Sequence, residues 1–377
     1  MEGKRIILTV TNDLVTDQRV HRAAATLERQ GCNVLVLGRK LPGSQPVGER
    51  SYRTHRMRLL FRRGALFYAC FNIRLFFALL FRRADLLVSN DLDTLPACFL
   101  ASRLKSCTLT YDSHEYFTEV PELIGRRFAR DTWIWIEKLL LPRVRYTSTV
   151  SQSVADAYRE RYGIEMDVIR NLPLAGEKEA RRPDLLDCGP QRIIIYQGAL
   201  NVGRGLESMI SAMQFLNAFQ LQIFGDGDIA GQLKDLTKKL ELEDRVVFMG
   251  RIAHGELKAY TRQASLGISL EEDKGLNYRY SLPNKIFDYI QAGIPVLVSD
   301  LPEMKRIVED YGIGQVLVDR EADKIAVQVR EMMDSDELRM TWKKNLRKAG
   351  KELNWEKEEK KLLDLYSKAF LARVYGL

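Results

Sequence analysis

The sequence predicts an α/β protein built from two doubly wound domains, and two observations support this fold class. Short apolar runs rich in β-branched residues alternate with segments of helical period, which is typical of parallel sheets with crossover helices. The alternation occurs in both halves of the 377 residues, and this length suffices for two domains with separate cores. The expected strands are 6–10, 33–37, 86–89, 109–112, 192–196, 219–224, 246–249, 266–270 and 296–299.

The boundary between the two domains is expected at residues 171–191. This linker is rich in charge, Pro and Gly, and it separates the two series of strands. We therefore expect an N-terminal domain over 1–170 and a C-terminal domain over 192–352. The last segment, 353–377, has helical period, and we expect it to pack back on the N-terminal domain.

Charge is distributed unevenly along the chain. Residues 1–174 contain 27 Lys and Arg but 18 Asp and Glu, whereas the whole chain contains 58 and 50. Anionic partners should therefore meet the N-terminal half first. No recognised nucleic-acid-binding module is present, so we expect no nucleic-acid partner.

The basic excess is concentrated in residues 50–83, which contain nine Arg and neither Lys nor an acid. These residues enclose an apolar stretch over 64–81. Its length approaches that of a membrane span, but Arg74 lies near its centre and a strand follows closely. Two interpretations remain open, a buried crossover helix and a helix that docks on an anionic membrane surface.

The five cysteines show neither a C-x-x-C pair nor zinc-ligand spacing, which favours reduced thiols and no metal site. The first apolar run is as short as a strand and is not followed by a cleavage-like segment. We therefore expect a cytoplasmic protein, either free or peripheral on the inner face of the membrane.

The most informative motif is YRYSLPNKIFDYIQAGIPVLVSD, over 278–300. It predicts a helix over 283–292, with Pro in the first position and Ser281 as its cap. A helix N-terminus attracts phosphate, and Lys285 in the first turn adds a cation. Asp288, three residues further on, is placed to accept from ribose hydroxyls. An ordinary core helix with a surface Lys and Asp explains the same pattern.

Three glycine-containing turns follow other strands of the C-terminal half, at the edge of the sheet where α/β proteins bind ligands. Glycine lets the backbone approach an anion closely, and Arg204 could hold phosphate bidentately. Gly225-Asp-Gly227 is not a full G-x-G-x-x-G and does not argue for NAD. Each turn alone is also explained as an ordinary strand-end loop. The residues concerned are Gly198, Gly203, Arg204, Gly225, Gly227, Arg251 and Ile252.

The motifs of the C-terminal half, taken in their order along the chain, resemble those of glycosyltransferase family 4. The resemblance covers nearly the whole chain, and S-L-P-N-K-x-F-D-Y-x-x-A-G-x-P-V is its most specific part. It implies a GT-B fold, two Rossmann-like domains that face each other across a cleft. It also implies a retaining, hexosyltransferase-like, metal-independent enzyme of bacterial polysaccharide or glycoconjugate synthesis. Such an enzyme moves a sugar from a nucleotide-diphosphate-sugar to a sugar or lipid-linked acceptor, without a cofactor.

The resemblance also implies roles for individual residues. Arg204 and Lys285 would be catalytic groups that hold the donor diphosphate, Asp288 would contact the ribose, and Arg251 with Ile252 would lie at the base. The other donor-binding candidates are Gly198, Gly203, Gly225, Gly227, Ser281, Leu282, Pro283 and Asn284.

The chain departs from the family pattern at three places. Asp288 replaces the second acid of the Glu–seven residues–Glu motif, and the first acid falls on Tyr280. Glu271 and Glu272 lie upstream as alternative carboxylates. Ala199 replaces the usual basic residue after the first glycine.

In the N-terminal half, TYDSHEYFTE over 110–119 places His114 directly after a strand. A lone His is often structural, but the resemblance makes His114 the third catalytic candidate, beside the donor sugar. Asp91 and Asp93 end the preceding strand, where they either orient an acceptor hydroxyl or cap the next helix. The remaining acceptor-side candidates are Asp17, Arg19 and Glu119.

Two other functions remain compatible with these residues. One is a nucleotide-sugar epimerase of the same fold, and the other is a non-catalytic nucleotide-sugar binding protein. In the retaining chemistry that the resemblance implies, the leaving phosphate takes the acceptor proton, so a carboxylate nucleophile is unnecessary.

Overall fold

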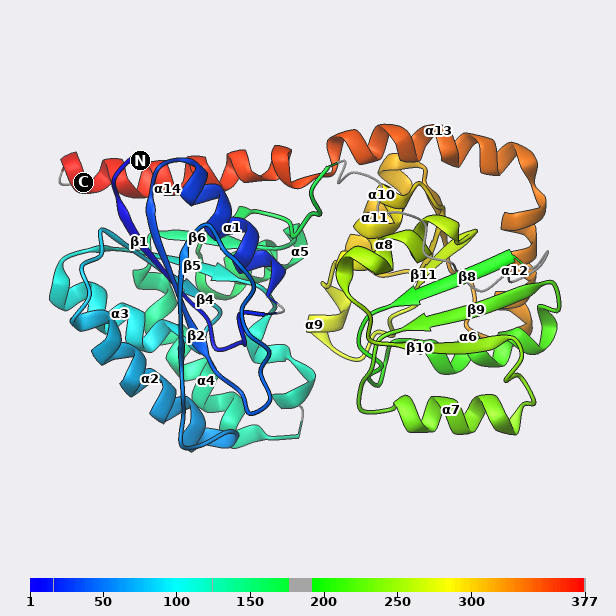
Figure 1. The fold of residues 1–377 in the computed structure, drawn as a ribbon, viewed down its shortest axis with the longest axis horizontal. Coiled ribbons are helices and arrows are strands. Elements are labelled where there is room, and N and C mark those ends of the chain that lie inside the picture. Colours follow the sequence, from blue (N-terminus) through cyan, green and yellow to red (C-terminus); the bar gives the residue numbers. More distant parts are fainter. Residues whose placement is uncertain (16, 124, 176–191, 376–377) are drawn as a thin grey trace. The chain divides into compact units, whose positions relative to one another are not determined.

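A computed structural model describes residues 1–15, 17–123, 125–175 and 192–375. Residues 176–191, most of the expected linker, lie outside the described residues. The chain divides into two compact units, one formed by residues 1–171 and 357–377 and the other by 172–356. Each unit is a parallel sheet covered by helices, which confirms the α/β, doubly wound fold class (Figure 1).

The first unit contains a seven-stranded sheet in the order β3-β2-β1-β4-β5-β6-β7, and every neighbouring pair is parallel. The chain reverses its direction of winding between β1 and β4, which places a ligand-binding crevice at their carboxyl ends. The strands are β1 (Arg5–Thr9), β2 (Asn33–Arg39), β3 (Arg53–Met57), β4 (Leu86–Asn90), β5 (Thr108–Ser113), β6 (Tyr146–Thr149) and β7 (Asp167–Val168).

Helices cover both faces of this sheet (Figure 1). Helices α2, α3 and α4 lie on one face, and α1 lies with the C-terminal helix α14 on the other. The helices are α1 (Gln18–Arg29), α2 (Gly64–Leu80), α3 (Leu95–Lys105), α4 (Arg127–Leu140), α5 (Gln152–Tyr162) and α14 (Trp355–Tyr375).

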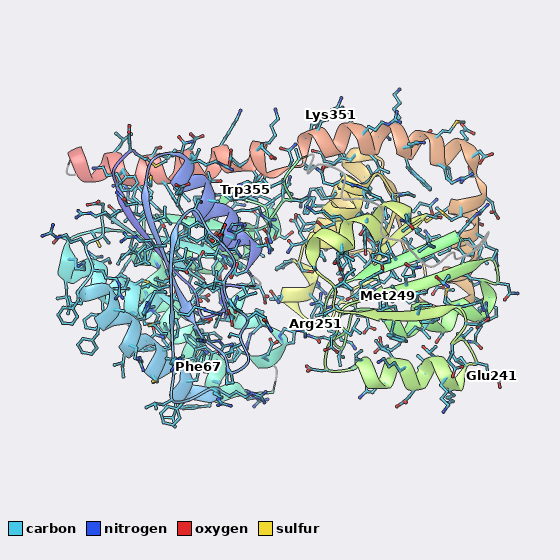
Figure 2. All side chains as sticks on the ribbon, in the orientation of Figure 1. Phe67, Glu241, Met249, Arg251, Lys351 and Trp355 are labelled. Carbon is cyan, nitrogen blue, oxygen red and sulfur yellow. The ribbon has the colours of Figure 1, made fainter. Side chains whose placement is uncertain are left out.

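The apolar stretch expected over 64–81 forms the crossover helix α2. Phe67, Phe71, Leu75 and Leu79, spaced by four residues, are at most 4% exposed and pack on the sheet. Phe67, the first of them, is labelled in Figure 2. Among the described residues, no helix combines the length and hydropathy that crossing a membrane requires. The buried side of α2 agrees with the interpretation as a crossover helix. The opposite side is exposed, and docking on an anionic membrane surface stays a prediction.

The second unit contains a six-stranded parallel sheet in the order β10-β9-β8-β11-β12-β13. Its winding reverses between β8 and β11, so a second crevice is expected at their carboxyl ends. The strands are β8 (Arg192–Gln197), β9 (Phe219–Phe224), β10 (Val246–Gly250), β11 (Leu266–Ser269), β12 (Val296–Val298) and β13 (Gly314–Val316).

The helices of the second unit surround a large apolar core. They are α6 (Leu206–Ala212), α7 (Ala230–Lys239), α8 (His254–Gln263), α9 (Leu276–Arg279), α10 (Asn284–Ala292), α11 (Pro302–Tyr311), α12 (Ala322–Asp334) and α13 (Asp336–Glu352).

The start of α10 differs from the expectation in two details. Pro283 is the residue before the helix, in an extended conformation, and the helix begins at Asn284. Ser281 does not cap it, because its hydroxyl donates to the Tyr278 carbonyl at 2.8 Å. The first amides of α10 therefore receive no side-chain cap, which suits an anion site better than a capped helix would.

Candidate functional site

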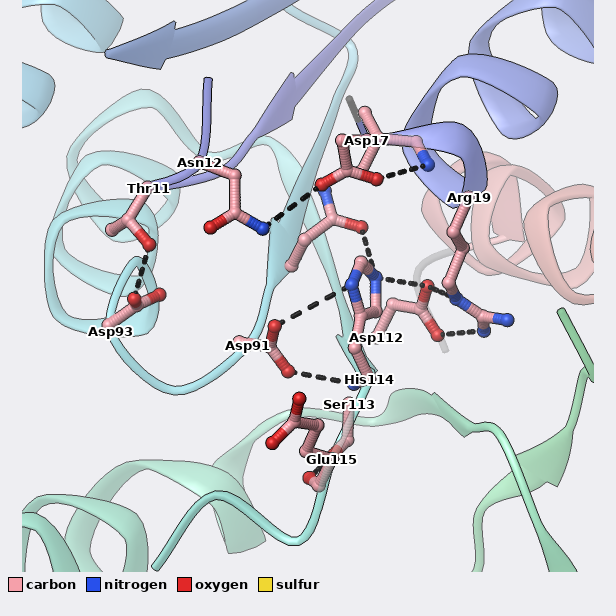
Figure 3. A network of polar contacts seen from close by, with 12 residues as sticks. Thr11, Asn12, Asp17, Arg19, Asp91, Asp93, Asp112, Ser113, His114 and Glu115 are labelled. Carbon is pink, nitrogen blue, oxygen red and sulfur yellow. Dashed lines mark hydrogen bonds and ion pairs between the residues drawn. The ribbon is translucent and has the colours of Figure 1, made fainter. Parts of the chain in front are cut away.

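The first candidate site lies where β1, β4 and β5 end, beside the reversal of winding in the first unit. His114, one residue beyond β5, is held by groups from two strand ends (Figure 3). Its Nε2 lies 3.2 Å from both Asn90 Oδ1 and Asp112 Oδ2, and its Nδ1 lies 3.6 Å from Asp91 Oδ2. The His114 side chain is 14% exposed, so part of it reaches the surface.

The buried ion pair between Arg19 and Asp112 fixes one side of this arrangement. Arg19 donates from Nε and Nη2 to the two carboxylate oxygens at 2.8 and 2.7 Å, and from Nη1 to the Ile169 carbonyl. Ser148 donates to the same carboxylate at 2.7 Å. Such a bidentate pair orients Asp112 toward His114. Arg19, a candidate for acceptor contact, is 5% exposed and positions the site from within.

The surrounding charges set the protonation of His114. Burial alone would lower the pKa of His114, but Asp91 and Asp112 raise it to about 9. Burial would likewise raise the pKa of Asp112, but Arg19 and His114 hold it well below its ordinary value. His114 is therefore an imidazolium at neutral pH, a hydrogen-bond donor rather than a base.

Neither Asp91 nor Asp93 caps α3, which corrects one of the two interpretations. Asp91, at φ 62°, accepts the backbone N–H of His114 at 2.7 Å. Asp93 accepts the Thr11 hydroxyl with Oδ2, whereas its buried Oδ1 has no partner among the described residues. Burial and the neighbouring Asp91 raise the pKa of Asp93 to about 7.

The last two acceptor-side candidates have structural contacts. Asp17 caps α1, since its side chain accepts from Val20 N at 3.0 Å. Glu119 accepts from Arg130 at 2.6 Å and lies 3.4 Å from Arg161. Asp17 also accepts from Asn12 at 3.3 Å, and both lie near the His114 network (Figure 3). Glu119 belongs to a separate ion-pair cluster with Arg130 and Arg161.

The second candidate site lies beside the reversal of winding in the second unit, around Glu271. This carboxylate follows β11 and is fully buried. Lys285 Nζ donates to its Oε1 at 2.7 Å, Arg204 Nη1 lies 3.5 Å from the same oxygen, and Ser269 donates to Oε2 at 2.7 Å. Burial would raise the pKa of Glu271, but Lys285, Ser269 and Arg204 keep it below its ordinary value. One carboxylate thus holds two cations.

Aromatic rings support both cations. Lys285 Nζ lies 4.2 Å from the centroid of the Tyr196 ring, and the Arg204 guanidinium carbon lies 5.3 Å from that of Tyr278. Cation–π contact of this kind holds a long side chain in place without neutralising its charge. The pair of cations is therefore preorganised, with one carboxylate for two positive charges.

The glycine turns bring backbone close to these cations. A side chain at Gly225 would place its Cβ 1.8 Å from the Gly198 carbonyl oxygen, and one at Gly205 would lie 2.0 Å from the Leu270 oxygen. Gly198 itself approaches Lys285, since a Cβ there would meet the Lys285 Cε at 3.5 Å. The turns after β8 and β9 therefore pack backbone against backbone, which only glycine allows.

The remaining donor-side candidates surround this centre. Ser281, Leu282 and Pro283 lead into α10 and are partly exposed, and Asn284 at its first position is exposed. Gly203 and Gly227 lie in the turns after β8 and β9.

Asp288 and Arg251 lie apart from the Glu271 centre. Asp288 accepts from Gln197 at 2.7 Å and lines a cavity of about 100 Å³ together with Thr261 of α8. Arg251, after β10, has a side chain that is 76% exposed, with its Nε 3.7 Å from Asp226 Oδ2, and Ile252 packs on the core.

The first acid of the Glu–seven residues–Glu motif could not be assigned from the sequence, which offered Tyr280, Glu271 and Glu272 as its position. Tyr280 follows α9, and Glu272 pairs with Lys274 at 2.7 Å. The signal that would have favoured Glu271 is its place two residues after the end of the buried strand β11. The same signal, a polar residue ending a strand, applies to Asp112, which was also missed. Among the described residues, no group of three or more His, Cys, Asp and Glu side chains is arranged to hold a metal ion.

Comparison with known families gives one match in each half of the chain. The family "Glycosyltransferase Family 4" matches residues 17–173, and "Glycosyl transferases group 1" matches residues 177–349. Each match covers less than half of the chain, and the two together extend over both units.

Solved structures share this GT-B fold. Sucrose-phosphate synthase from Thermosynechococcus elongatus superposes with a TM-score of 0.79 at 19% identity, over 98% of this chain and all of the other. HepE from Anabaena, in complex with UDP and glucose, gives a TM-score of 0.78 at 15% identity, over 97% and 100%. At these identities the likeness establishes the fold.

Among curated proteins, α-D-kanosaminyltransferase from Streptomyces kanamyceticus is 25% identical over 260 residues, which is 64% of this GT-B chain and 65% of the relative. The chain spans 65% or less of the length of the curated relatives that it matches.

Proposed function

We propose that this protein is a retaining glycosyltransferase that takes a sugar from a nucleoside-diphosphate-sugar. The second unit binds the donor, and the first unit binds the acceptor. The observation that carries the proposal is the placement of Lys285 and Arg204 around the buried Glu271, at the reversal of winding of a parallel sheet.

This arrangement suits a diphosphate for an electrostatic reason. Lys285 and Arg204 both contact the Glu271 carboxylate, and the start of α10, which no side chain of the described residues caps, adds its positive dipole end beside them. Negative charge grows on the diphosphate as the glycosidic bond breaks. Preorganised cations stabilise that charge without further rearrangement, and stabilisation of this kind supplies most of the rate enhancement in many enzymes. Lys285 and Arg204 therefore serve in place of a metal ion.

The acceptor side adds a proton donor. Because His114 is an imidazolium at neutral pH, its Nδ1–H can donate to an oxygen of a bound sugar, since Nδ1 lies 3.6 Å from Asp91 Oδ2, which is longer than a hydrogen bond. Its Nε2 remains held by Asp112 at 3.2 Å. The leaving phosphate then takes the acceptor proton on the same face of the sugar, so the anomeric configuration is retained. Asp288 and the turn at Arg251 complete the proposal as the ribose and base contacts.

Relatives support a sugar nucleotide as the donor. HepE was solved with UDP and glucose and with UDP-glucose, and the name of the kanosaminyltransferase describes a sugar transfer. For the present chain, a sugar or lipid-linked acceptor on the cytoplasmic side is part of the proposal.

The first test measures donor binding and turnover in Lys285→Ala. We expect this variant to lose at least a hundredfold in turnover and most of the thermal stabilisation that UDP or GDP gives the wild type. Because the substitution leaves Glu271 without its main partner, the paired variant Lys285→Met/Glu271→Gln removes one positive and one negative charge together. This variant leaves the net charge of the centre unchanged, and it should fold but not bind. Lys344→Ala, on the exposed side of α13, is the control. Normal turnover in both site variants would contradict the proposal.

The second measurement separates the alternatives. Nucleoside diphosphate released only when acceptor is present indicates a transferase, and the anomeric configuration of the product, read by NMR, tests retention. Release without acceptor indicates a hydrolase or an epimerase. Binding without release indicates a nucleotide-sugar binding protein.

A further inference from the structure

Large apolar side chains are exposed on the outer side of α2, α3 and α4, and we call them the apolar face. The three helices pack beside one another on the same side of the first sheet (Figure 1), and Tyr68 of α2 meets Trp133 of α4 edge to face at 5.0 Å. Each side chain is between 40% and 88% exposed. They are Leu66, Ile73, Phe77, Phe81, Leu100, Leu104, Phe128, Trp135 and Leu139.

Helix α2 shows that this exposure is not incidental. Arg74 is the only charged residue among its 17 residues. The side facing the sheet is buried, but Leu66, Ile73 and Phe77, spaced by seven and four residues, lie on the opposite side and are more than half exposed. A helix that is apolar on all sides is normally covered on all sides. The outer side of α2 therefore lacks a covering surface.

A strongly basic pocket adjoins the N-terminal end of α2. It has a volume of about 500 Å³, and its lining includes Arg39, Lys40, Arg58 and Arg62 but no acidic residue. None of these four side chains forms an ion pair within the described part of the chain. The buried Nε of Arg39 has no hydrogen-bond partner there, and its guanidinium lies 4.8 Å from the ring centroid of Phe67. The basic pocket is thus built for an anion.

We propose that the apolar face and the basic pocket together form a membrane-docking surface. The apolar side chains of α2, α3 and α4 enter the boundary between headgroups and acyl chains, and the basic pocket binds the phosphate of an anionic phospholipid. Large apolar residues flanked by arginines are the composition of interfacial membrane anchors. The nine Arg and absence of acids over 50–83 match an anionic bilayer.

Charge and polarity favour the bilayer over the other occupants. A nucleic acid would pair with the arginines but would leave nine large apolar side chains in water. A second copy of this chain would bring two clusters of unpaired arginines together. A bilayer with anionic lipid covers the apolar side chains and neutralises the arginines at the same time. The inference does not depend on the proposed function.

The first arm of the test is co-sedimentation of the full chain with lipid vesicles. We expect binding to vesicles of phosphatidylcholine with 30% phosphatidylglycerol, weaker binding at 0.5 M salt, and little binding to phosphatidylcholine alone. Protein that stays in the supernatant with both kinds of vesicle would overturn the proposal. So would equal binding to both kinds, because the basic pocket would then have no role.

The second arm uses paired variants. Arg58→Glu/Arg62→Glu should lower the vesicle partition coefficient at least tenfold, as should Phe77→Asp/Phe128→Asp. The matched controls lie on α13 in the other unit. Lys344→Glu/Lys348→Glu changes the same charge, and Met340→Asp replaces an apolar side chain that is 68% exposed. Both controls should bind as the wild type does. Equal binding by all four variants would overturn the proposal.

Two further outcomes would also overturn it. One is that the protein does not bind vesicles but gives a gel shift with single-stranded RNA, which Arg58→Glu/Arg62→Glu abolishes. The other is a dimer in sedimentation velocity that Phe77→Asp/Phe128→Asp converts to monomer. Circular dichroism melts establish that each variant is folded. If an aspartate variant is not, Phe81→Ser replaces it, since this side chain is 81% exposed.

Discussion

Asp93 and His114 belong to one buried network, but their pKa values favour opposite charge states. His114 is charged, whereas the charged form of Asp93 is disfavoured. His114 gains two carboxylate neighbours, so its charged form is favoured in spite of burial. Asp93 gains only the Thr11 hydroxyl and lies near another acid, so its charged form is disfavoured. At neutral pH the network therefore contains a fixed imidazolium and a carboxyl group that is close to its titration midpoint.

The raised pKa of Asp93 makes stability depend on pH. Its folded-state pKa of about 7 lies above the unfolded value near 4, so the unfolded chain loses the proton first. Asp93 therefore lowers the free energy of unfolding progressively as pH rises from 4 to 7. We expect Asp93→Asn to raise it by about 1–3 kcal/mol at pH 8 and by much less at pH 4, measured by urea unfolding.

Asp85→Asn is the control of opposite sign. Arg5 is the main cause that lowers the pKa of Asp85, to about 2, so its stabilisation is present above pH 4 and is lost as pH falls toward 2. This variant should be less stable than the wild type at pH 8. An effect of Asp93→Asn that is the same at both pH values would show that folding does not raise the pKa of Asp93.

At the scale of the element, the turns after β8 and β9 depend on close backbone contact. Gly225, at φ 137°, faces the Gly198 carbonyl oxygen, and backbone cannot move aside as a flexible side chain can. The loop that carries Gly198 also approaches Lys285, so displacing it changes the donor site.

We expect Gly225→Ala to lower the free energy of unfolding of the second unit by about 2–4 kcal/mol, measured in urea, because it combines strain with a clash. Gly231→Ala is the matched control. Gly231 lies in the first turn of α7, and a Cβ there meets nothing within 4 Å. The control should gain about 0.5–1 kcal/mol from helix propensity. A neutral Gly225→Ala would mean that the turn accommodates a side chain.

At the scale of the whole molecule, each unit has a core of its own. One core lies between α2, α3 and the first sheet, and the other surrounds the second sheet. Two cores of this kind can unfold independently.

Calorimetry should therefore resolve two unfolding transitions. Gly225→Ala should lower the midpoint of one of them, and UDP in excess should raise the midpoint of that same transition. If calorimetry shows a single transition, and both Gly225→Ala and added UDP shift its midpoint, the two units unfold together.

The sequence by itself determined the fold class and most of the strands, because apolar runs that alternate with helical segments need only local periodicity to be recognised. The periodicity did not predict the edge strand β3, since three of its five residues are charged or His and its burial alternates. The same periodicity located α2, whose four-residue spacing of buried side chains reflects helix geometry.

Only the tertiary structure decided which polar groups meet. Glu271 lies 14 residues before Lys285 and 67 after Arg204, and no spacing rule links them. They converge because parallel strands end at a common edge, beside the point where the winding reverses. Arg19 meets Asp112 for the same reason. The exposure of the apolar face also required the structure, since an apolar sequence does not show which side of a helix stays uncovered.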